Sequence, residues 1–318
     1  MTGLPNLPVA GAAPSAQRPR LPEWFKVKAP GGPAYAAIKQ ALRERGLSTV
    51  CEEARCPNLA ECWGGGPKGV GTATVMVMGG TCTRGCRFCS VPTGKPGPLD
   101  AEEPRKVSET VGLMGVGYVV VTSVDRDDLP DGGAAHFAQV IRRCKADHPA
   151  LLVEVLTPDF QGDEAALAAI VAASPDVVAH NVETVRRLTP AVRDRRAGYD
   201  QTLAVLRAYK RLGARYTKTS IMLGLGETEA EVEECLRDLR EAGVDIVTFG
   251  QYLRPSQEAR HLPVTEFVHP RQFDAYAEMA RGMGFLYVAS GPLVRSSYKA
   301  GELFLEGMIR GANPALHV

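Results

Sequence analysis

The sequence predicts an α/β protein built as a partial (β/α)6-type barrel of six or seven strands. Of its 318 residues, 45% are hydrophobic and 23% are charged, which is typical of a globular chain with a large core. From Thr72 onward, short apolar runs alternate with segments of helical period, as in parallel strands joined by crossover helices. Polar residues recur where the runs end, the position at which barrel enzymes place their active sites. An open, doubly wound sheet is the alternative.

The chain is expected to comprise four parts. In order, they are a flexible Pro/Gly-rich N-terminal arm (1–33), an extension that carries three cysteines (34–71), the barrel (72–290) and a C-terminal segment that closes the barrel mouth (291–318). A short helix is expected at Tyr35–Arg45, ending near Gly46. The stretch WFKVK at 24–28 has the composition of an arm that docks onto the main body.

Within the barrel, the apolar runs are continuous rather than alternating, which indicates strands covered on both faces. The expected strands are Ala73–Met78, Tyr118–Val124, Leu151–Leu156, Val177–Asn181, Lys218–Leu223, Ile246–Tyr252 and Phe285–Ala289. The clearest helices are Ala134–Ala146, Asp163–Ala173, Asp200–Leu212, Glu229–Ala242 and Arg271–Met283, and three of them stop at Gly213, Gly243 and Gly284.

Charge and hydropathy exclude several functions. The net charge of +1 gives no reason to expect binding to nucleic acid or membranes. Apolar runs such as Tyr118 to Val121 are far shorter than the ~20 residues of a membrane helix. Pro5, Pro8 and Pro14 interrupt the stretch where a signal peptide would stand. A cytoplasmic location is expected, with an organelle transit peptide left open.

Cysteine usage points to a metal or redox function. Six of the eight cysteines fall between Cys51 and Cys89, and clustered cysteines in a reducing compartment are typical of metal ligands or redox groups. Cys144 and Cys235 stand alone in helical segments and are expected to be buried apolar residues.

The second cysteine triplet follows the first barrel strand directly. Cys82, Cys86 and Cys89 form the pattern C-x-x-x-C-x-x-C. Three thiolates are one short of closing a tetrahedral zinc site or saturating a four-iron cluster, so a cluster here would keep one iron open. A zinc site that takes its fourth ligand from elsewhere is the alternative.

The first triplet, Cys51, Cys56 and Cys62, precedes the barrel in the pattern C-x4-C-x5-C. It also supplies only three thiolates. A second cluster, with an unusual fourth ligand or an open iron, is the interpretation that fits.

Two charged stretches have two interpretations each. DRDDL (125–129) either lines the active site or caps the following helix. The arginine-rich stretch between Val185 and Gly198 is either a solvated face or a patch that steers an acidic carrier domain or pairs with a carboxylate of the substrate or cofactor. Its members are Arg186, Arg187, Arg193, Arg195 and Arg196, against the single acid Asp194.

The barrel triplet, with Phe88 before its last cysteine, resembles the signature of the radical S-adenosylmethionine (SAM) superfamily. With C-x4-C-x5-C ahead of it, the pattern is similar to one family, lipoyl synthase. The resemblance runs from about Pro22 through Ala300 with no departure at a motif position. It includes VTSVDRDDLPDGGAAHF (121–137), HNVETV (180–185), KTSIMLGLGET (218–228), GQYLRP (250–255) and SGPLVRSSYKAGE (290–302).

The resemblance implies two 4Fe-4S clusters. The cluster at Cys82, Cys86 and Cys89 would bind SAM through its open iron and cleave it to a 5′-deoxyadenosyl radical. The cluster at Cys51, Cys56 and Cys62 would be the auxiliary cluster that gives up sulfur. A serine of the RSSY segment supplies its fourth ligand in this family, here Ser297 or alternatively Ser296. An alkoxide is a poorer match to iron–sulfur chemistry than a thiolate, which favours release.

Further residues are implied as contacts for SAM. Gly224 and Gly226 of GLGET resemble the superfamily's segment near the adenine, and the alternative is a turn with a helix N-cap. Asn181 and Glu183 would meet the ribose hydroxyls, and the alternative is a polar strand terminus.

The implied reaction inserts two sulfur atoms at C6 and C8 of a protein-bound octanoyl-lysine. The implied partners are octanoylated lipoyl domains or the glycine-cleavage carrier protein, and an electron donor such as ferredoxin or flavodoxin. Both clusters would have to share one substrate pocket, so the first triplet and the RSSY segment are expected to meet over the barrel mouth. Another radical SAM enzyme, or a zinc-binding structural protein, is the competing hypothesis.

Overall fold

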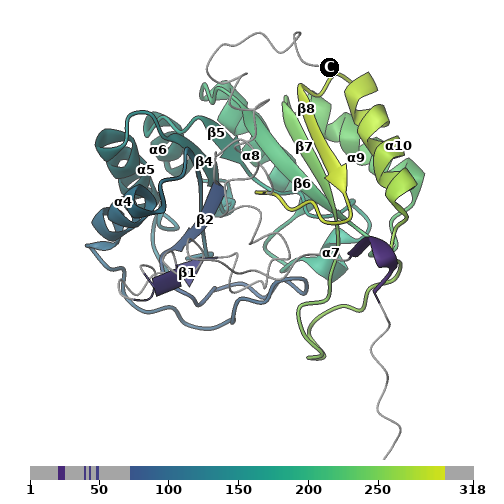
Figure 1. Cartoon of the computed structure of the whole chain (residues 1–318), viewed down its shortest axis with the longest axis horizontal. Coiled ribbons are helices and arrows are strands. Elements are labelled where there is room, and N and C mark those ends of the chain that lie inside the picture. The colour runs from purple at the N-terminus through teal and green to yellow at the C-terminus, as the bar shows by residue number, and fades with distance from the viewer. Residues whose placement is uncertain (1–20, 26–38, 41–42, 44–47, 50–71, 298–318) are drawn as a thin grey trace, which may run out of the picture.

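The computed structural model describes residues 21–25, 39–40, 43, 48–49 and 72–297 (Figure 1). Its sheet orders the described strands β1 to β8 as they follow in the chain, with β2 to β8 parallel and β1 antiparallel at the edge. The strands are β1 (Ser48–Thr49), β2 (Thr72–Val77), β3 (Tyr118–Ser123), β4 (Leu152–Leu156), β5 (Val177–Ala179), β6 (Thr217–Leu223), β7 (Ile246–Gln251) and β8 (Tyr287–Gly291). Because β2 and β8 are not paired in this sheet, the barrel is partial, as predicted, with seven parallel strands.

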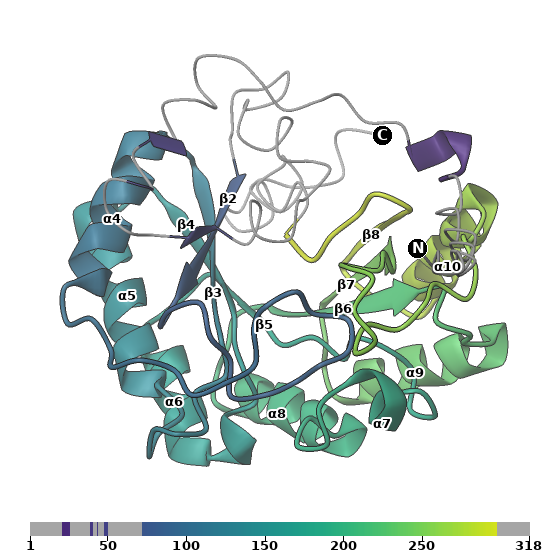
Figure 2. The same cartoon turned by 90° about the horizontal axis from the view of Figure 1, so that it is seen from below.

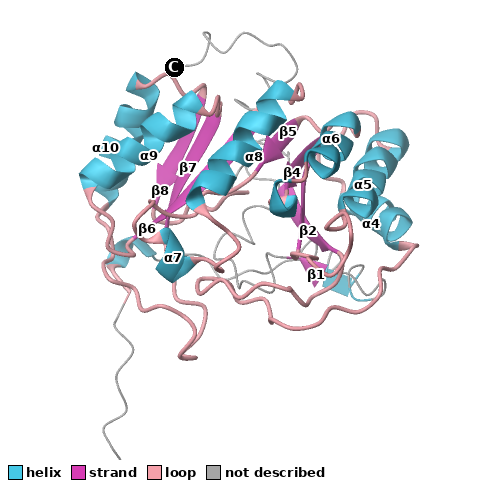
Figure 3. Cartoon of the chain, turned by 180° about the vertical axis from the view of Figure 1, so that it is seen from behind, coloured by secondary structure: helices cyan, strands magenta, loops and turns pink. Residues whose placement is uncertain are grey.

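The longer helices cover the outer face of the sheet, as Figures 2 and 3 show. This arrangement, together with the sequential strand order, excludes the doubly wound alternative, whose helices cover both faces. The helical elements of the described chain are η1 (Glu23–Phe25), α4 (Glu103–Met114), α5 (Ala134–Asp147), η2 (Phe160–Gly162), α6 (Glu164–Ala172), α7 (Thr189–Val192), α8 (Tyr199–Arg211), α9 (Glu229–Glu241) and α10 (Pro270–Gly282).

The core has two layers, which explains why the strands are apolar on both faces. Val119 and Val121 of β3 pack outward in a cluster with side chains of α4, α5 and α6. Tyr118 and Val120 of the same strand face inward and join Ile246 of β7 in a cluster inside the barrel. Alternate residues of one strand therefore serve different layers, and both layers are buried.

Local signals at the helix ends agree with the sequence. Thr228 and Glu231 form a capping box at the start of α9. The glycines at 213, 243 and 284 follow α8, α9 and α10 with positive φ, the conformation expected beyond a helix C-terminus.

All seven expected strands and all five expected helices are present, with ends shifted by a few residues. The expected helix at Tyr35–Arg45 lies mainly outside the described residues, of which 39, 40 and 43 are helical. In the N-terminal arm, Trp24 contacts His269 and Phe25 contacts Phe267 edge-on, in keeping with a docked arm. Within the described residues, no helix has the length and apolar character needed to cross a membrane.

Candidate active site at the barrel mouth

Cys82, Cys86 and Cys89 lie on the loop that follows β2, residues 79–94, which we call the cysteine loop. The arrow of β8 points down in Figure 1, so the view from below in Figure 2 looks onto the carboxyl ends of the strands, where this loop lies. Met78 and Gly79 both have positive φ, 67° and 90°, and turn the chain sharply out of the strand. The loop closes on itself through two 2.9 Å bonds, Cys82 N–H to Pro92 O and Gly94 N–H to Cys82 O.

The sulfur atoms of the cysteine loop receive backbone N–H groups. Cys82 Sγ accepts from Asp125 N at 3.3 Å and from Arg84 N at 3.4 Å, and Cys86 Sγ accepts from Asp194 N at 3.3 Å. Burial raises the pKa of the Cys82 thiol to about 12 and that of Cys86 to about 11. Without a metal the two thiols are therefore protonated at neutral pH, and binding a metal releases their protons. Donors to sulfur of this kind are typical of iron–sulfur sites.

The cysteine geometry fits a cluster better than a single metal ion. Among the described residues, no three Cys, His, Asp or Glu side chains are arranged to hold one ion. In a cubic cluster each cysteine binds a different iron atom, so the three sulfurs need not converge on one point. The zinc alternative requires that convergence and is disfavoured.

Arg84, between the first two cysteines, anchors the loop to two neighbouring strands. Its side chain is 3% exposed. Its guanidinium donates to Asp127 at 2.7 and 3.0 Å and to Asp159 through two 2.7 Å bonds, and lies 3.3 Å from Asp125. Burial lowers the pKa of Arg84, but the hydrogen bonds to Asp127 and Asp159 raise it above its ordinary value. The guanidinium therefore stays charged. Asp125 and Asp127 follow β3 and Asp159 follows β4, so one residue joins the cysteine loop to both strand ends.

The sequence did not single out Arg84 or Asp159. A signal was present, because one arginine inside the cysteine pattern stands against acids at the ends of two strands. For DRDDL, the structure favours the first interpretation. Its Asp127 holds Arg84 and accepts from Thr83 at 2.8 Å, while the helix that follows, α5, has no side-chain cap at Gly133.

Asn181 and Glu183 lie just beyond β5 and close to the cysteine loop. The Asn181 side chain hydrogen-bonds to Glu183. Burial raises the pKa of the Cys89 thiol, and the nearby charge of Glu183 raises it further. Burial raises the pKa of Glu183, and its φ of 67° is unusual for a residue other than glycine. Asn181 is 8% exposed, yet its Oδ1 has no hydrogen-bond partner in the described structure. An unusual backbone conformation at Glu183 beside an unpaired buried amide oxygen is typical of a ligand-binding site.

Gly224 and Gly226 form a tight turn between β6 and α9. Both have positive φ, 93° and 105°. A Cβ on Gly224 would collide with the carbonyl of Glu266, whereas one on Gly226 would only touch the Thr265 side chain. The Glu227 carboxylate accepts the N–H of Gly224 and that of Leu225. The turn-and-cap alternative is therefore present, and it supplies a structural reason for both glycines.

The same turn also lies beside the cysteine loop. Leu225 belongs to an apolar cluster with Val192 and Tyr252, and Phe88, the aromatic residue before Cys89, packs against that cluster. The GLGET turn, the end of β7 and the cysteine loop thus meet at one place.

The C-terminal segment passes over the end of β7. The Val294 carbonyl lies so close to Gly250 that no Cβ would fit there, and Arg295 donates to the Gln251 carbonyl. Ser296 and Ser297 follow and are half-buried. Cys51, Cys56 and Cys62 lie outside the described residues, so their expected meeting with Ser297 stays a prediction.

The arginine-rich stretch does not act as one surface. Arg186 pairs with Asp200 and Arg187 pairs with Glu231, and both arginines are exposed. Arg193 is buried, donates to Thr202 at 2.7 Å and leaves its Nε without a partner in the described structure. Arg196 turns toward the cysteine loop.

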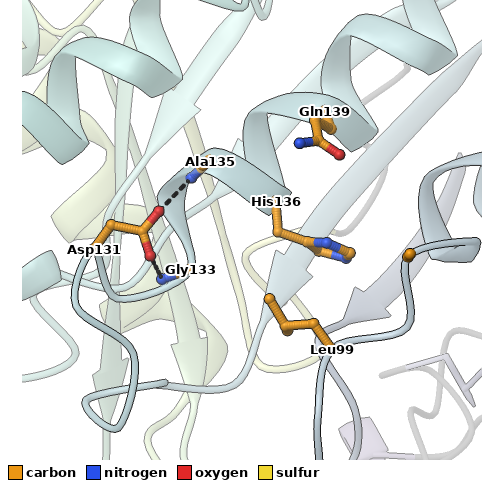
Figure 4. A pocket seen from close by; sticks show the side chains of 7 residues that line it. Leu99, Asp131, Gly133, Ala135, His136 and Gln139 are labelled. Atoms are coloured by element: carbon orange, nitrogen blue, oxygen red, sulfur yellow. Dashed lines mark hydrogen bonds between the residues drawn. The ribbon is translucent and has the colours of Figure 1, made fainter.

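A separate pocket of about 320 Å³ lies beside the start of α5 (Figure 4). Its polar groups are already engaged. Asp131 accepts the N–H of Gly133 and of Ala135, each at 2.9 Å, and His136 Nε2 lies 2.7 Å from Glu103, a residue of α4 that also holds the N–H of Met78. It contains none of the candidate residues, so the mouth remains the candidate site.

Comparison with known proteins agrees with this geometry. Residues 76–239 match the model of the radical SAM superfamily, and residues 11–56 match the N-terminal domain of lipoyl synthase. The chain is 61% identical to a lipoyl synthase of Anaeromyxobacter sp. (strain Fw109-5), covering 93% of this chain and 98% of that one. It is 54% identical to a mitochondrial lipoyl synthase of Laccaria bicolor, covering 94% and 78%.

Solved structures support the fold alone. A crystal structure of methylornithine synthase matches with a TM-score of 0.52 at 15% identity, covering 83% of this chain and 86% of that one. A maturase of the FeFe-hydrogenase, HydG, matches with a TM-score of 0.54 at 14% identity, covering 80% and 67%. The partial barrel, the cysteine loop at its mouth and the high identity over most of the chain lead to one conclusion: the chain belongs to the lipoyl synthase family of radical SAM enzymes.

Proposed function

We propose that the two cysteine triplets hold two 4Fe-4S clusters with different tasks. Cys82, Cys86 and Cys89 ligate the cluster that binds SAM. Cys51, Cys56 and Cys62, with Ser297 as the fourth ligand, ligate a second cluster that gives up sulfur. The reaction is that of the lipoyl synthase family, the insertion of two sulfur atoms at C6 and C8 of a protein-bound octanoyl-lysine.

The observation that carries the assignment of the first triplet is the set of donors around its sulfurs. Cys82 and Cys86 accept three backbone N–H groups between them, and a backbone N–H at Val91 favours the thiolate of Cys89. Such donors stabilise anionic sulfur in a site that burial would otherwise keep neutral. The bound cluster and SAM supply a 5′-deoxyadenosyl radical, which requires a site closed to water.

The chain's own residues bind and orient SAM. Asn181 Oδ1 is an unpaired acceptor, and we assign it with Glu183 to the ribose hydroxyls. Arg193 lies near both Cys86 and Glu183, and its buried guanidinium keeps one N–H free for a carboxylate. The turn at Gly224 and Gly226 packs through Leu225 beside Phe88, which favours its predicted place next to the adenine.

The macromolecular partners follow from the reaction. We propose an octanoylated lipoyl domain or the glycine-cleavage carrier protein as the substrate, a ferredoxin or flavodoxin as the electron donor, and the cytoplasm as the location. Arg186, Arg187 and Arg196 contact carboxylates of this chain and Arg193 is buried, so in the described structure the exposed Arg195 is the arginine of this stretch left to attract an acidic carrier.

Two triple variants test the division of labour under anaerobic conditions with SAM, a reductant and an octanoylated lipoyl-domain peptide. Replacing Cys51, Cys56 and Cys62 by Ala should preserve 5′-deoxyadenosine formation and abolish sulfur insertion. Replacing Cys82, Cys86 and Cys89 by Ala should abolish both. Sulfur insertion by the first variant would contradict the proposal. Deoxyadenosine without any sulfur-bearing product in the parent protein would favour another radical SAM reaction.

A further inference from the structure

The end of α7 and the residues that follow it contact the cysteine loop at several points. We call residues 191–196 the clamp segment. Arg87 N–H donates to Val192 O at 2.9 Å, and the Arg87 guanidinium reaches Ala191 O at 3.5 Å. About a hundred residues of sequence separate the two segments, so these contacts are tertiary ones.

Asp194 contacts the loop with both its backbone and its side chain. Its N–H donates to Cys86 Sγ at 3.3 Å, and its Oδ2 accepts the N–H of Gly85 at 2.9 Å. Its side chain is 13% exposed, so these bonds are largely shielded from water. One residue therefore fixes both the sulfur atom of Cys86 and the peptide just before it.

Arg196 holds Asp194 in this position and adds a contact of its own. Its Nε donates to Asp194 Oδ1 at 2.8 Å, and a further N–H donates to the Thr83 carbonyl at 2.7 Å. It also lies 3.1 Å from Asp127, which forms an ion pair with Arg84 as well. The loop is thus held from β3 and β4 through Arg84 and from the clamp segment through Asp194 and Arg196.

We propose that Asp194 and Arg196 are positioning residues that hold the cysteine loop closed around its cluster and thereby slow the loss of iron. The inference rests on the proposed function, because it takes Cys86 as a cluster ligand. It assigns a role to two members of the charged stretch whose composition suggested a docking patch. Their side chains hydrogen-bond to each other and to the cysteine loop of this chain, which favours a role within the chain over a docking role.

The physical basis is the cost of opening the loop. A part-buried hydrogen bond to a charged group opposes opening of the loop, so losing one should speed the opening about tenfold or more. The N–H donor at Cys86 also shapes the electronic environment of the ligand, because hydrogen bonds to sulfur tune iron–sulfur centres. Loss of the clamp should therefore alter both the kinetics and the spectrum of the cluster.

The test uses the full chain with Cys51, Cys56 and Cys62 replaced by Ala, so that iron reports on the cysteine loop alone. The rate of iron release to a chelator is measured anaerobically, together with the electron paramagnetic resonance spectrum of the reduced protein. In this parent, Asp194→Ala is expected to release iron about tenfold faster, with a shifted spectrum. Asp194→Asn keeps an oxygen for Gly85 N–H but loses the ion pair with Arg196, so it is expected to release iron faster than the parent and more slowly than Asp194→Ala.

Arg186→Ala is the matched control, because Arg186 belongs to the same stretch but pairs with Asp200 of α8 and Asp238 of α9. It should match the parent in both readouts. A parental rate and spectrum in Asp194→Ala would overturn the inference, as would equal acceleration in the control. If Asp194→Ala does not fold, Arg196→Ala decides, and a parental rate there overturns it. A parent that holds no iron contradicts the ligand assignment itself.

Discussion

The two ends of the barrel each bury a cation, and they do so differently. Near the amino ends of the strands, Lys218 and Glu154 form a single ion pair at 2.8 and 2.9 Å, with side chains 2% and 1% exposed. Tyr118 donates its hydroxyl to the same carboxylate at 2.7 Å. At the carboxyl ends, Arg84 is surrounded by three carboxylates.

The two ends differ in charge balance and in whether their buried polar groups all have partners. The amino end, which we call the closed end, is filled by the apolar cluster around Tyr118, and there one buried cation meets one buried anion. At the mouth, acids outnumber Arg84, Glu183 has a positive φ, and the Oδ1 of Asn181 stays unpaired. In barrel enzymes the first arrangement is typical of stability and the second of a functional face. Removing a charge at each end should therefore damage different properties.

The largest expected effect is at the closed end. Glu154→Gln leaves the Lys218 ammonium buried without a counter-charge, which should lower the free energy of unfolding by about 3–5 kcal/mol. Denaturant unfolding of the apoprotein measures it. Glu233→Gln, which breaks the exposed pair with Arg237, is the control and should cost less than about 1 kcal/mol. A loss below about 1 kcal/mol in Glu154→Gln would contradict a stabilising role for this ion pair.

At the mouth, Arg84→Gln should chiefly reduce cluster binding. Three carboxylates then face one another beside Cys82, and stability falls as well, because the buried Asp159 carboxylate loses its counter-charge. Iron bound per folded chain should fall several-fold, whereas Glu154→Gln should keep the parental iron content. Arg84→Lys should not restore it, because an ammonium cannot bridge Asp127 and Asp159. Full iron content in Arg84→Gln would remove the contrast between the two ends.

The paired glycines sharpen the comparison within the mouth. Gly224→Ala forces a left-handed residue against the Glu266 carbonyl and should destabilise the protein by about 2 kcal/mol or more. Gly226→Ala carries only the backbone strain, about 1 kcal/mol. Thermal unfolding of the two apoproteins compares them. Equal losses would mean that the contact with Glu266 does not matter.

The smallest expected effect is at the surface ion pair between Arg187 and Glu231. A hydrogen bond from Arg187 lowers the pKa of Glu231 to about 2, below its ordinary value of 4.5. A folded-state pKa below the unfolded value stabilises the protein above about pH 4.5, and that contribution disappears as the pH falls toward 2. Arg187→Gln should therefore cost about 0.5 kcal/mol at pH 6 and nothing near pH 2. Apoprotein unfolding at several pH values tests this, and a pH-independent difference would contradict it.

Much of the fold was predictable because strands β2 to β7 are buried on both faces and each long helix is buried on one. The run around Val119 and Val121 could be recognised without knowing its partners. Helix α4 was not among the clearest predictions, since its first residues, EPRK, are largely charged and its buried face rests on Val107 and Val111. The short β1 and α7 carry too few residues to show a period.

The cysteine loop was predictable from spacing, but what holds it was not. Arg84 and Asp159 are 75 residues apart, and Asp194 meets Gly85 across 109. Only the folding of the barrel brings such pairs together, so no local pattern contains them. The glycines of GLGET are the opposite case, because their positions were recognised from the sequence. The structure adds a reason within the chain: both have positive φ, and the Glu266 carbonyl lies against Gly224.

The most direct test of the function is the mass of an octanoylated lipoyl domain after one anaerobic turnover. The protein is reconstituted with isotope-labelled sulfide and then freed of unbound sulfide before SAM and reductant are added. The account predicts a product that has lost two hydrogens and gained two sulfur atoms, both labelled, with 5′-deoxyadenosine formed alongside. An unmodified octanoyl chain, or unlabelled sulfur in the product, would contradict the claim that a cluster of this chain supplies the sulfur.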